Sequence, residues 1–279
     1  MKLSVCIITL NEEANIARTL ASVRFAQELI VVDSGSTDRT AEIAREHGAQ
    51  VFIEPWAGFA AQKNSAIAKC TGDWILSLDA DEEVSPELQS QIRALLPSQH
   101  LCEAYCIPRR NLFFGRWIKH GGFYPDLKLR LFKRGSARFE ERLVHETMVI
   151  TGRASNLDCD IIHHAYPTLE SYIEHMNLYS SLGAEIAANK GKTSRSLPAF
   201  LSNVVLRPVA TFVWNYFFRL GFLDGREGLL THLYHCTYVG WKYAKAWQIG
   251  LGRGRHESRD RLGGKRSGTY RAVRDINKE

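Results

Sequence analysis

The first hundred residues alternate short apolar runs with segments of helical period. Apolar runs at 3–9, 28–33, 51–54 and 74–79 predict strands, and the polar–apolar pattern at 13–23, 40–47 and 60–70 predicts helices between them. A strand–helix alternation of this kind favours a parallel sheet with right-handed crossovers. We therefore expect an α/β fold with a mostly parallel sheet flanked by helices.

The pattern changes after residue 97. Strand-like segments follow at 104–108, 128–133, 144–151 and 160–163, and a helical period returns at 169–189, 198–220 and 226–248. We predict one domain over residues 1–165, with halves at 1–100 and 101–165. A helical region over 166–250, with amphipathic C-terminal helices, and a basic, disordered tail over 251–279 are predicted to follow.

The segment 198–220 is rich in apolar and aromatic residues. Asn203, Arg207, Pro208 and Asn215 interrupt it, so it does not read as a membrane span. Aromatic residues mixed with arginine favour a helix that lies in a membrane interface, and the basic tail favours an anionic membrane surface as its partner. Packing on its own domain or on a second subunit is the alternative.

The charge is concentrated at one end of the chain. The formal net charge is +6 over 279 residues, and nine Lys/Arg against four acids in residues 250–279 supply most of it. The remainder is close to neutral, which argues against a nucleic-acid partner. Residues 1–4 lead directly into a strand without a signal-peptide pattern, so a cytoplasmic location is expected.

Two carboxylates, Asp79 and Asp81, follow the predicted strand 74–79. Ligands of open α/β sheets bind beyond the carboxyl ends of strands, and residues two apart in extended chain point to one side. Such crowded carboxylates raise each other's pKa unless a cation or hydrogen-bond donors compensate, and a divalent ion with oxygen ligands, Mg²⁺ or Mn²⁺, is the natural compensator. The alternative is a solvated acidic turn before the helix that begins near Pro86.

Other nucleotide-binding classes have signatures that this chain lacks. The first strand is followed by Leu10-Asn11-Glu12-Glu13 rather than Gly-x-Gly-x-x-Gly, which argues against a dinucleotide oxidoreductase. A phosphate-binding Gly-x-x-x-x-Gly-Lys-Ser/Thr loop and the glycine-rich, basic first loop of sugar-nucleotide pyrophosphorylases are also missing.

The stretches SVCIITLNEE (4–13), VVDSGSTD (31–38) and DAD (79–81) resemble inverting glycosyltransferase family 2 over roughly residues 2–165. The resemblance implies a GT-A fold, Rossmann-like, whose first half binds a nucleotide sugar and whose second half binds the acceptor. Val144-His145-Glu146 and Gly221-Phe222-Leu223-Asp224-Gly225 resemble the lipopolysaccharide core β-1,4-glucosyltransferases. This implies inverting transfer from a UDP-sugar, UDP-glucose above others, to lipopolysaccharide core or a lipid-linked glycan, with Mg²⁺ or Mn²⁺. It places the protein peripherally on the inner face of the cytoplasmic membrane.

The resemblance also implies roles for individual residues. Asp81 is expected to bind the metal and Asp79 the metal or ribose, while Glu146 is the expected base and Asp126 the second candidate. His145 or His163 would add a metal ligand or orient the base. The remaining nucleotide-sugar residues are Thr9, Asn11 and Glu12 at the base and ribose, Asp33 at the uracil N–H, and Lys63 and Arg130 at the diphosphate. A non-catalytic sugar-nucleotide-binding or scaffolding protein at the membrane surface is the alternative from another class.

Overall fold

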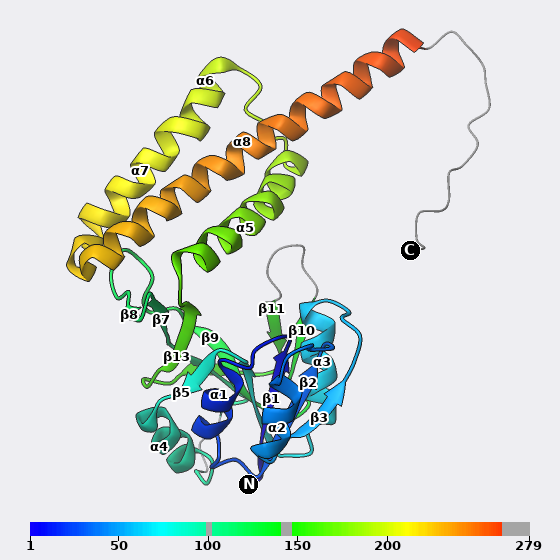
Figure 1. Ribbon diagram of the computed structural model, residues 1–279, viewed down its shortest axis with the longest axis vertical. Helices are drawn as coiled ribbons and strands as arrows, with labels where there is room; N and C mark the ends of the chain where they lie inside the picture. The colour runs from blue at the N-terminus through cyan, green and yellow to red at the C-terminus, as the bar shows by residue number, and fades with distance from the viewer. Residues whose placement is uncertain (99–101, 141–146, 264–279) are drawn as a thin grey trace.

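The structure is a computed structural model that describes residues 1–98, 102–140 and 147–263, with side chains as far as residue 252. An α/β body carries a group of long helices at one end (Figure 1). The body ends with strand β13 (Ile161–Tyr166), and the helices begin with α5 (Leu169–Asn189). The predicted boundary at residue 165 therefore falls at the junction of the two regions.

The main sheet has seven strands in the order β12-β6-β9-β4-β1-β2-β3. The strands β4, β1, β2 and β3 pair in parallel, whereas β9 is antiparallel to both β4 and β6. The predicted α/β class is confirmed, with an antiparallel strand inside the sheet. The seven strands are β1 (Leu3–Thr9), β2 (Glu28–Asp33), β3 (Gln50–Ile53), β4 (Trp74–Asp79), β6 (Ala104–Ile107), β9 (Lys128–Lys133) and β12 (Ala154–Asn156).

Alternate residues of the central strands build two cores. Val5 and Ile7 face one core, while Cys6 between them faces the other, as the period of two in a strand requires. The first core packs against α1 (Ile16–Ser22), α2 (Thr40–Glu46) and α4 (Pro86–Leu95). The second packs against α3 (Phe59–Lys69) and the hairpin of β10 (Ala137–Glu140) and β11 (Thr147–Ile150). Helices thus cover both faces of the sheet.

A smaller sheet connects the acidic turn after β4 to later parts of the chain. It contains β5 (Glu82–Val84), β13, β7 (Arg109–Phe113) and β8 (Arg116–Trp117) in that order. His163 of β13 pairs with Glu82 on one side and with Asn111 on the other. Because β5 begins one residue after Asp81, this register brings β13 beside the Asp79–Asp81 turn.

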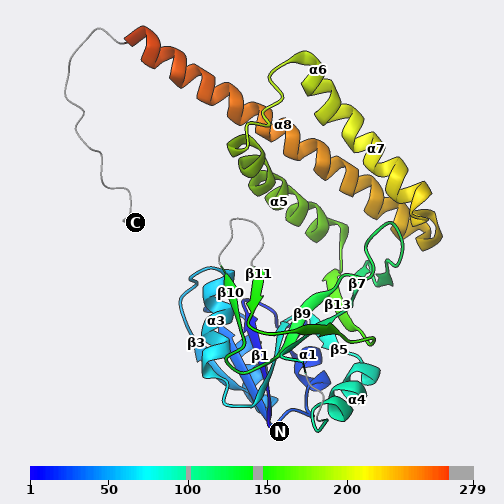
Figure 2. The same cartoon turned by 180° about the vertical axis from the view of Figure 1, so that it is seen from behind.

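The helical region is a hairpin with a third helix against it. Residues 197–218 form one helical segment of α6 (Leu197–Phe200), η1 (Leu201–Leu206), α7 (Arg207–Val213) and η2 (Trp214–Phe218), in which η1 and η2 are π-helical turns. A short turn, η3 (Gly221–Asp224), leads into α8 (Gly225–Gly263). In both views α8 lies between α5 and the segment 197–218 (Figures 1 and 2).

The prediction of a disordered tail from residue 251 is wrong for its first part. Residues 251–263 continue α8, and no proline interrupts the helix there. The rest of the predicted tail lies outside the described residues.

Among the described residues, one helical segment, Leu197–Phe218, is long and apolar enough to cross a membrane by length and composition. We expected the polar residues of this segment to argue against a membrane span, but the segment passes the test of length and composition in spite of them. One side of the segment packs along α8, where Arg207 Nη1 donates to the Tyr243 hydroxyl over 2.8 Å. Only 6% of its most apolar window is buried, so its other side is exposed.

Candidate active site

A cavity of about 1090 Å³ lies between the α/β body and helices α5 and α8, beyond the carboxyl ends of β1 and β4. This is the position where open α/β sheets bind ligands. One wall is polar and charged, and the other is aromatic. The polar wall includes Thr9, Glu12, Ser34, Lys63, Asp79, Asp81, Arg109, Lys128, Arg130 and His163; the aromatic wall includes Phe113, Phe123, Tyr166, Tyr172, His175, Tyr179, His235 and Tyr238.

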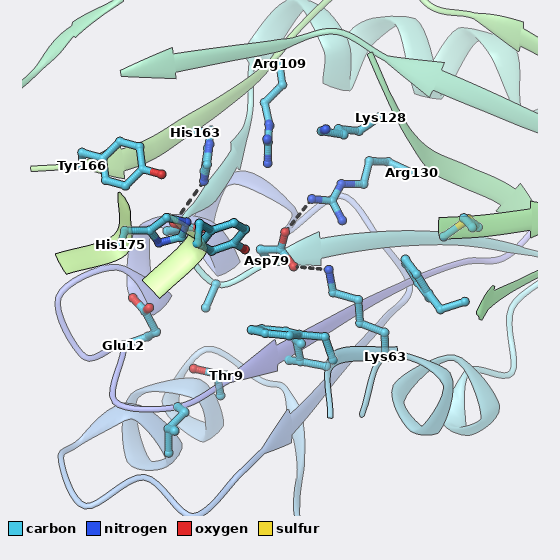
Figure 3. Close-up of a pocket in the computed structure, with 18 of the residues that line it drawn as sticks. Thr9, Glu12, Lys63, Asp79, Arg109, Lys128, Arg130, His163, Tyr166 and His175 are labelled. Carbon is cyan, nitrogen blue, oxygen red and sulfur yellow. Dashed lines mark hydrogen bonds and ion pairs between the residues drawn. The ribbon is translucent and has the colours of Figure 1, made fainter. Parts of the chain in front are cut away.

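Asp79 is held by two cations from different elements (Figure 3). Lys63 Nζ of α3 lies 2.9 Å from its Oδ1, and Arg130 Nη2 of β9 lies 2.6 Å from its Oδ2. Burial by itself would raise the pKa of Asp79, but Arg130 and Lys63 outweigh it and hold this pKa well below its usual range. The two cations predicted to face a diphosphate are therefore at the site, already oriented by Asp79.

The residue that organises this wall is Glu82, which the sequence interpretation missed. Its side chain is fully buried, and its Oε1 lies 2.5 Å from Arg130 Nη2 and 3.0 Å from Arg109 Nη1. Its Oε2 accepts the backbone N–H of Asp79 over 3.0 Å. Glu82 therefore links β5, β7, β9 and the end of β4. The available signal was a third acid directly after Asp81, in a position that pairs as a strand.

Asp81 faces His163, with 3.2 Å between Asp81 Oδ2 and His163 Nε2. The other ring nitrogen, Nδ1, lies 2.7 Å from Asn111 Oδ1. The Asn111 amide donates through Nδ2 to Asp126, which leaves its Oδ1 as an acceptor for His163. In the neutral imidazole Nδ1 therefore carries the proton and Nε2 is the lone-pair nitrogen, as in a metal-binding histidine.

A carboxylate and an imidazole are donors that suit Mn²⁺ and, less strongly, Mg²⁺. The described residues contain no group of three or more His, Cys, Asp or Glu side chains placed to hold a metal ion. The pair of Asp81 and His163 thus fits a metal whose other ligands come from a bound substrate, as is usual for ions that carry a diphosphate. His145, the other predicted histidine, lies outside the described residues.

Thr9 and Ser34 line the cavity at the ends of β1 and β2. Their hydroxyl oxygens are buried and have no hydrogen-bond partner within the part of the chain that is described. Such groups normally have partners in folded proteins, so a ligand that bonds to them would remove the cost of leaving them unpaired. Glu12 also lines the cavity; burial raises its pKa, and Asn15 Nδ2 donates to it over 2.7 Å.

Asn11 and Asp33, predicted at the base and ribose, are not among the residues that line the cavity. Asn11 has φ 54° and its side-chain oxygen accepts the backbone N–H of Thr37 over 2.9 Å. Asp33 is fully buried and accepts the backbone N–H groups of Gly35 and Ser36 over 2.9 and 2.7 Å. Asn11 thus joins the loop after β1 to the loop after β2, and Asp33 orders the loop after β2. Their sequence neighbours, Leu10 and Ser34, line the cavity instead.

Asp126 was the second candidate for the base. Arg109 Nη2 lies 2.7 Å from its carboxylate and Lys128 Nζ lies 3.0 Å from it. Burial by itself would raise the pKa of Asp126, but the opposite effect of Arg109 and Lys128 is larger and lowers this pKa to about 2. A carboxylate with so low a pKa is a weak base, and Asp126 is not among the residues that line the cavity. Glu146, the first candidate, lies outside the described residues.

The aromatic wall was visible in the sequence only as a helical period. Tyr172 and Tyr179 belong to α5, and the His175 and Tyr179 rings stack with centroids 4.2 Å apart. Phe123, from the loop 121–125, contacts His235 of α8 at 5.8 Å between centroids. Burial, with a smaller effect of His232 and Lys242, lowers the pKa of His235 to about 4. This wall is a neutral surface that suits an organic ligand.

Comparisons with known proteins show related sequences over most of the chain. The family model described as "Glycosyl transferase family 2" matches residues 4–177. An uncharacterized glycosyltransferase of Rickettsia typhi is 31% identical over 262 residues, covering 90% of this chain and 88% of its own. The lipopolysaccharide core biosynthesis glycosyltransferase LpsC of Rhizobium meliloti is 31% identical over 260 residues, covering 89% of this chain and 93% of its own.

A solved structure shares the fold. The mannosyltransferase of Pyrobaculum calidifontis, in complex with GDP-Man and Mn²⁺, superposes with a TM-score of 0.52 at 17% identity, over 88% of this chain and 86% of that one. Similarity at this level of identity concerns the fold alone, and it agrees with the GT-A architecture expected from the sequence.

Proposed function

The chain belongs to glycosyl transferase family 2, and on this premise we propose that it transfers a sugar from a UDP-sugar to lipopolysaccharide core or a related lipid-linked glycan. The proposed reaction inverts the configuration at the anomeric carbon, and UDP-glucose is the favoured donor. The observation that carries the proposal is the Asp81–His163 pair, which faces an aromatic wall across one cavity. A relative named for lipopolysaccharide core biosynthesis, matched over most of both chains, supports the acceptor.

Asp81 and His163 would hold Mg²⁺ or Mn²⁺ together with the donor. When bound, the metal would supply positive charge that stabilises the leaving diphosphate. The chain adds charge of its own: Lys63, Arg109, Lys128 and Arg130 line the cavity. They are paired with three carboxylates, those of Asp79, Glu82 and Asp126. These cations are oriented before a ligand arrives, which is the arrangement that stabilises developing charge at low reorganisation cost.

The uracil base of the donor would lie at Thr9 and Ser34, whose buried hydroxyl groups are otherwise unpaired among the described residues. The acceptor hydroxyl would approach from the aromatic wall and attack the anomeric carbon on the face opposite the diphosphate. Its proton must pass to a carboxylate. Glu146 stays the predicted base, because the ion pairs of Asp126 with Arg109 and Lys128 make that carboxylate weakly basic.

The proposed location is peripheral, on the cytoplasmic face of the membrane that carries the acceptor. The support is the exposed apolar side of the segment 197–218, whose opposite side packs along α8. Trp214, Phe217 and Phe218 on this side are 55%, 54% and 69% exposed. Aromatic side chains of this kind are typical of membrane interfaces.

The direct test is release of UDP from a panel of UDP-sugars, each with Mn²⁺, with Mg²⁺ and with EDTA, in the presence of truncated lipopolysaccharide. Turnover of one donor that EDTA abolishes is expected. Calorimetric binding of UDP without any turnover would favour the scaffolding alternative, and binding that EDTA leaves unchanged would remove the metal. A protein that binds no UDP would contradict the proposed donor.

A further inference from the structure

A second pocket, of about 500 Å³, lies where the α/β body meets the end of the segment 197–218. It shares no lining residue with the candidate active site. The residues that line it are Lys119, His120, Gly121, Gly122, Tyr124, Phe218, Arg219 and Leu220. The glycosyl-transfer proposal assigns no role to any of them.

The pocket is held together by contacts between two parts of the chain. Gly121 donates its backbone N–H to the Arg219 carbonyl over 2.8 Å. His120 donates its backbone N–H to Asp224 over 2.8 Å, and its Nδ1 lies 2.7 Å from the same carboxylate. Gly122 has φ 87°, and a Cβ there would lie 2.2 Å from Arg219 Nη1. The Arg219 guanidinium therefore lies directly over the glycine backbone.

The pocket carries positive charge that the described side chains do not neutralise. Lys119 and Arg219 are both exposed, and neither forms an ion pair with a carboxylate in the described part of the chain. The Lys119 ammonium lies 5.4 Å from the centre of the Trp117 ring. Asp224, which accepts from His120 of this pocket, is buried and already paired with it. Two cations that converge on one pocket without a neutralising carboxylate form a site that favours a phosphate.

The rim of the pocket is apolar and exposed. Phe218 is 69% exposed and Leu220 46%, and Phe217, Phe222 and Leu223 beside them are 54%, 44% and 51% exposed. A soluble phosphate ligand does not require such a rim. Positive charge next to exposed aromatic and aliphatic side chains is the pattern of an anionic membrane interface, where headgroup phosphates lie directly above the acyl chains.

We propose that this pocket binds the phosphate of an anionic phospholipid headgroup through Lys119 and Arg219, with Phe218 and Leu220 entering the acyl region. The inference rests on the membrane association proposed above and names the lipid chemistry that it uses. Because the pocket joins the α/β body to the helices, a lipid bound there would orient the candidate active site relative to the membrane.

The test is flotation of the full chain with phosphatidylcholine vesicles that contain 20% phosphatidylglycerol, compared with vesicles of equal negative charge supplied by oleate. The double variant Lys119→Gln, Arg219→Gln is expected to lose about 30-fold in partitioning to phosphatidylglycerol vesicles. The matched control is Arg24→Gln, Arg45→Gln, which removes the same charge from exposed positions of the α/β body. The control is expected to keep its binding, and both variants should release UDP at the wild-type rate with a soluble acceptor.

Each other outcome overturns part of the inference. Equal losses in the pocket and control variants, or an equal loss on oleate vesicles, would mean attraction by charge without a phosphate site. Displacement from vesicles by millimolar inorganic phosphate at constant ionic strength would make free phosphate the ligand. Wild-type protein that floats with neither vesicle would contradict membrane association and the pocket together, while UDP release tests the glycosyl-transfer proposal separately. Phe218→Ser with Leu220→Ser is expected to reduce binding to both vesicles, because it removes the apolar contact.

Discussion

The two walls of the large cavity are built on different principles. On the polar wall, side chains from α3, β5, β7 and β9 form ion pairs around Asp79 and Glu82, at 2.5–3.0 Å. On the opposite wall, rings from α5, β13 and α8 pack on one another, as in the Tyr166–Tyr172 pair at 4.8 Å between centroids. Ion pairs hold the side chains of the first wall in place, and its cations suit the diphosphate that nucleoside-diphosphate sugars share. Ring packing holds the side chains of the second wall in place, and this wall suits the acceptor, which differs between enzymes.

The largest effect is expected on the polar wall, at Asp81. Asp81→Asn keeps the shape of the side chain but removes the charge that would hold the metal beside His163. We expect UDP release to fall roughly 1000-fold, about 4 kcal/mol in the activation free energy. Glu83→Gln is the control, since Glu83 contacts His164 and is not among the residues that line the cavity. Equal activity in the two variants would remove Asp81 from the mechanism.

The polar wall should also contribute most to stability. Arg130→Met leaves the buried Glu82 without one of its two cations and Asp79 without its closest one. We expect a loss of about 3–5 kcal/mol in the free energy of unfolding, measured with urea, because a buried charge loses its partner. Arg138→Met removes an exposed pair with Glu140, at 3.4 Å, and should cost at most about 1 kcal/mol. If both variants lose a similar free energy of unfolding, the buried ion pairs contribute no more to stability than the exposed pair does.

On acidification the aromatic wall should weaken first. His235 has a folded-state pKa of about 4, lowered from 6.5 by burial and, less, by His232 and Lys242. The unfolded chain takes up this proton as the pH falls through 6.5 and the folded chain only near 4, so stability is lost between these values, by up to about 3 kcal/mol. The depressed pKa of Asp126, about 2 against 3.8, destabilises only at lower pH.

His235→Phe removes this titration. Its urea midpoint should change less than that of the wild type between pH 7 and pH 4.5. If the urea midpoint of His235→Phe falls between pH 7 and pH 4.5 by as much as that of the wild type, other groups cause the acid sensitivity.

The strands that bound the cavity were predictable because each is an apolar run between turn residues. Residues 3–9, 28–33, 74–79 and 128–133 were predicted with the bounds that the structure has. Helix α1 begins at Ile16 rather than 13, because residues 12–15 form a turn in which Asn15 donates its backbone N–H to the Glu12 carbonyl. Local pattern identifies such elements well and their ends less well.

The lining of the cavity was predictable where a residue stands at the end of a strand or just after it, as Thr9, Asp79 and Asp81 do. It was not predictable where two side chains meet through strand pairing. Asp81 meets His163 only because β13 pairs with β5 in a register that no local pattern specifies. Asp33 shows what a position at a strand end leaves open: a carboxylate there can bind a ligand or cap the following turn, and in this structure it accepts the N–H groups of the turn.

Asn111 offers a smaller test of the polar wall. It accepts the Nδ1 proton of His163 and so sets which ring nitrogen faces Asp81. In Asn111→Ala the Mn²⁺ concentration for half-maximal UDP release should rise about 10-fold or more, with activity recovering at saturating metal. Asn64→Ala, which removes hydrogen bonds to Phe139 instead, is the control and should leave the metal requirement unchanged. If the Mn²⁺ concentration for half-maximal UDP release is also unchanged in Asn111→Ala, His163 does not act as a metal ligand.

The smallest effect is expected at Tyr179, and it separates the two walls. Tyr179 lines the cavity and stacks on His175, so Tyr179→Leu should raise the KM for truncated lipopolysaccharide roughly 5-fold, about 1 kcal/mol. Slow hydrolysis of the donor without acceptor should keep its rate, because no cation of the polar wall is changed. Tyr234→Leu is the control: Tyr234 also contacts Tyr172, at 6.4 Å, but is not among the cavity-lining residues. A rise in the KM for the UDP-sugar with an unchanged KM for the acceptor would place Tyr179 on the donor side. The division of the cavity into a charged donor wall and an aromatic acceptor wall would then be wrong.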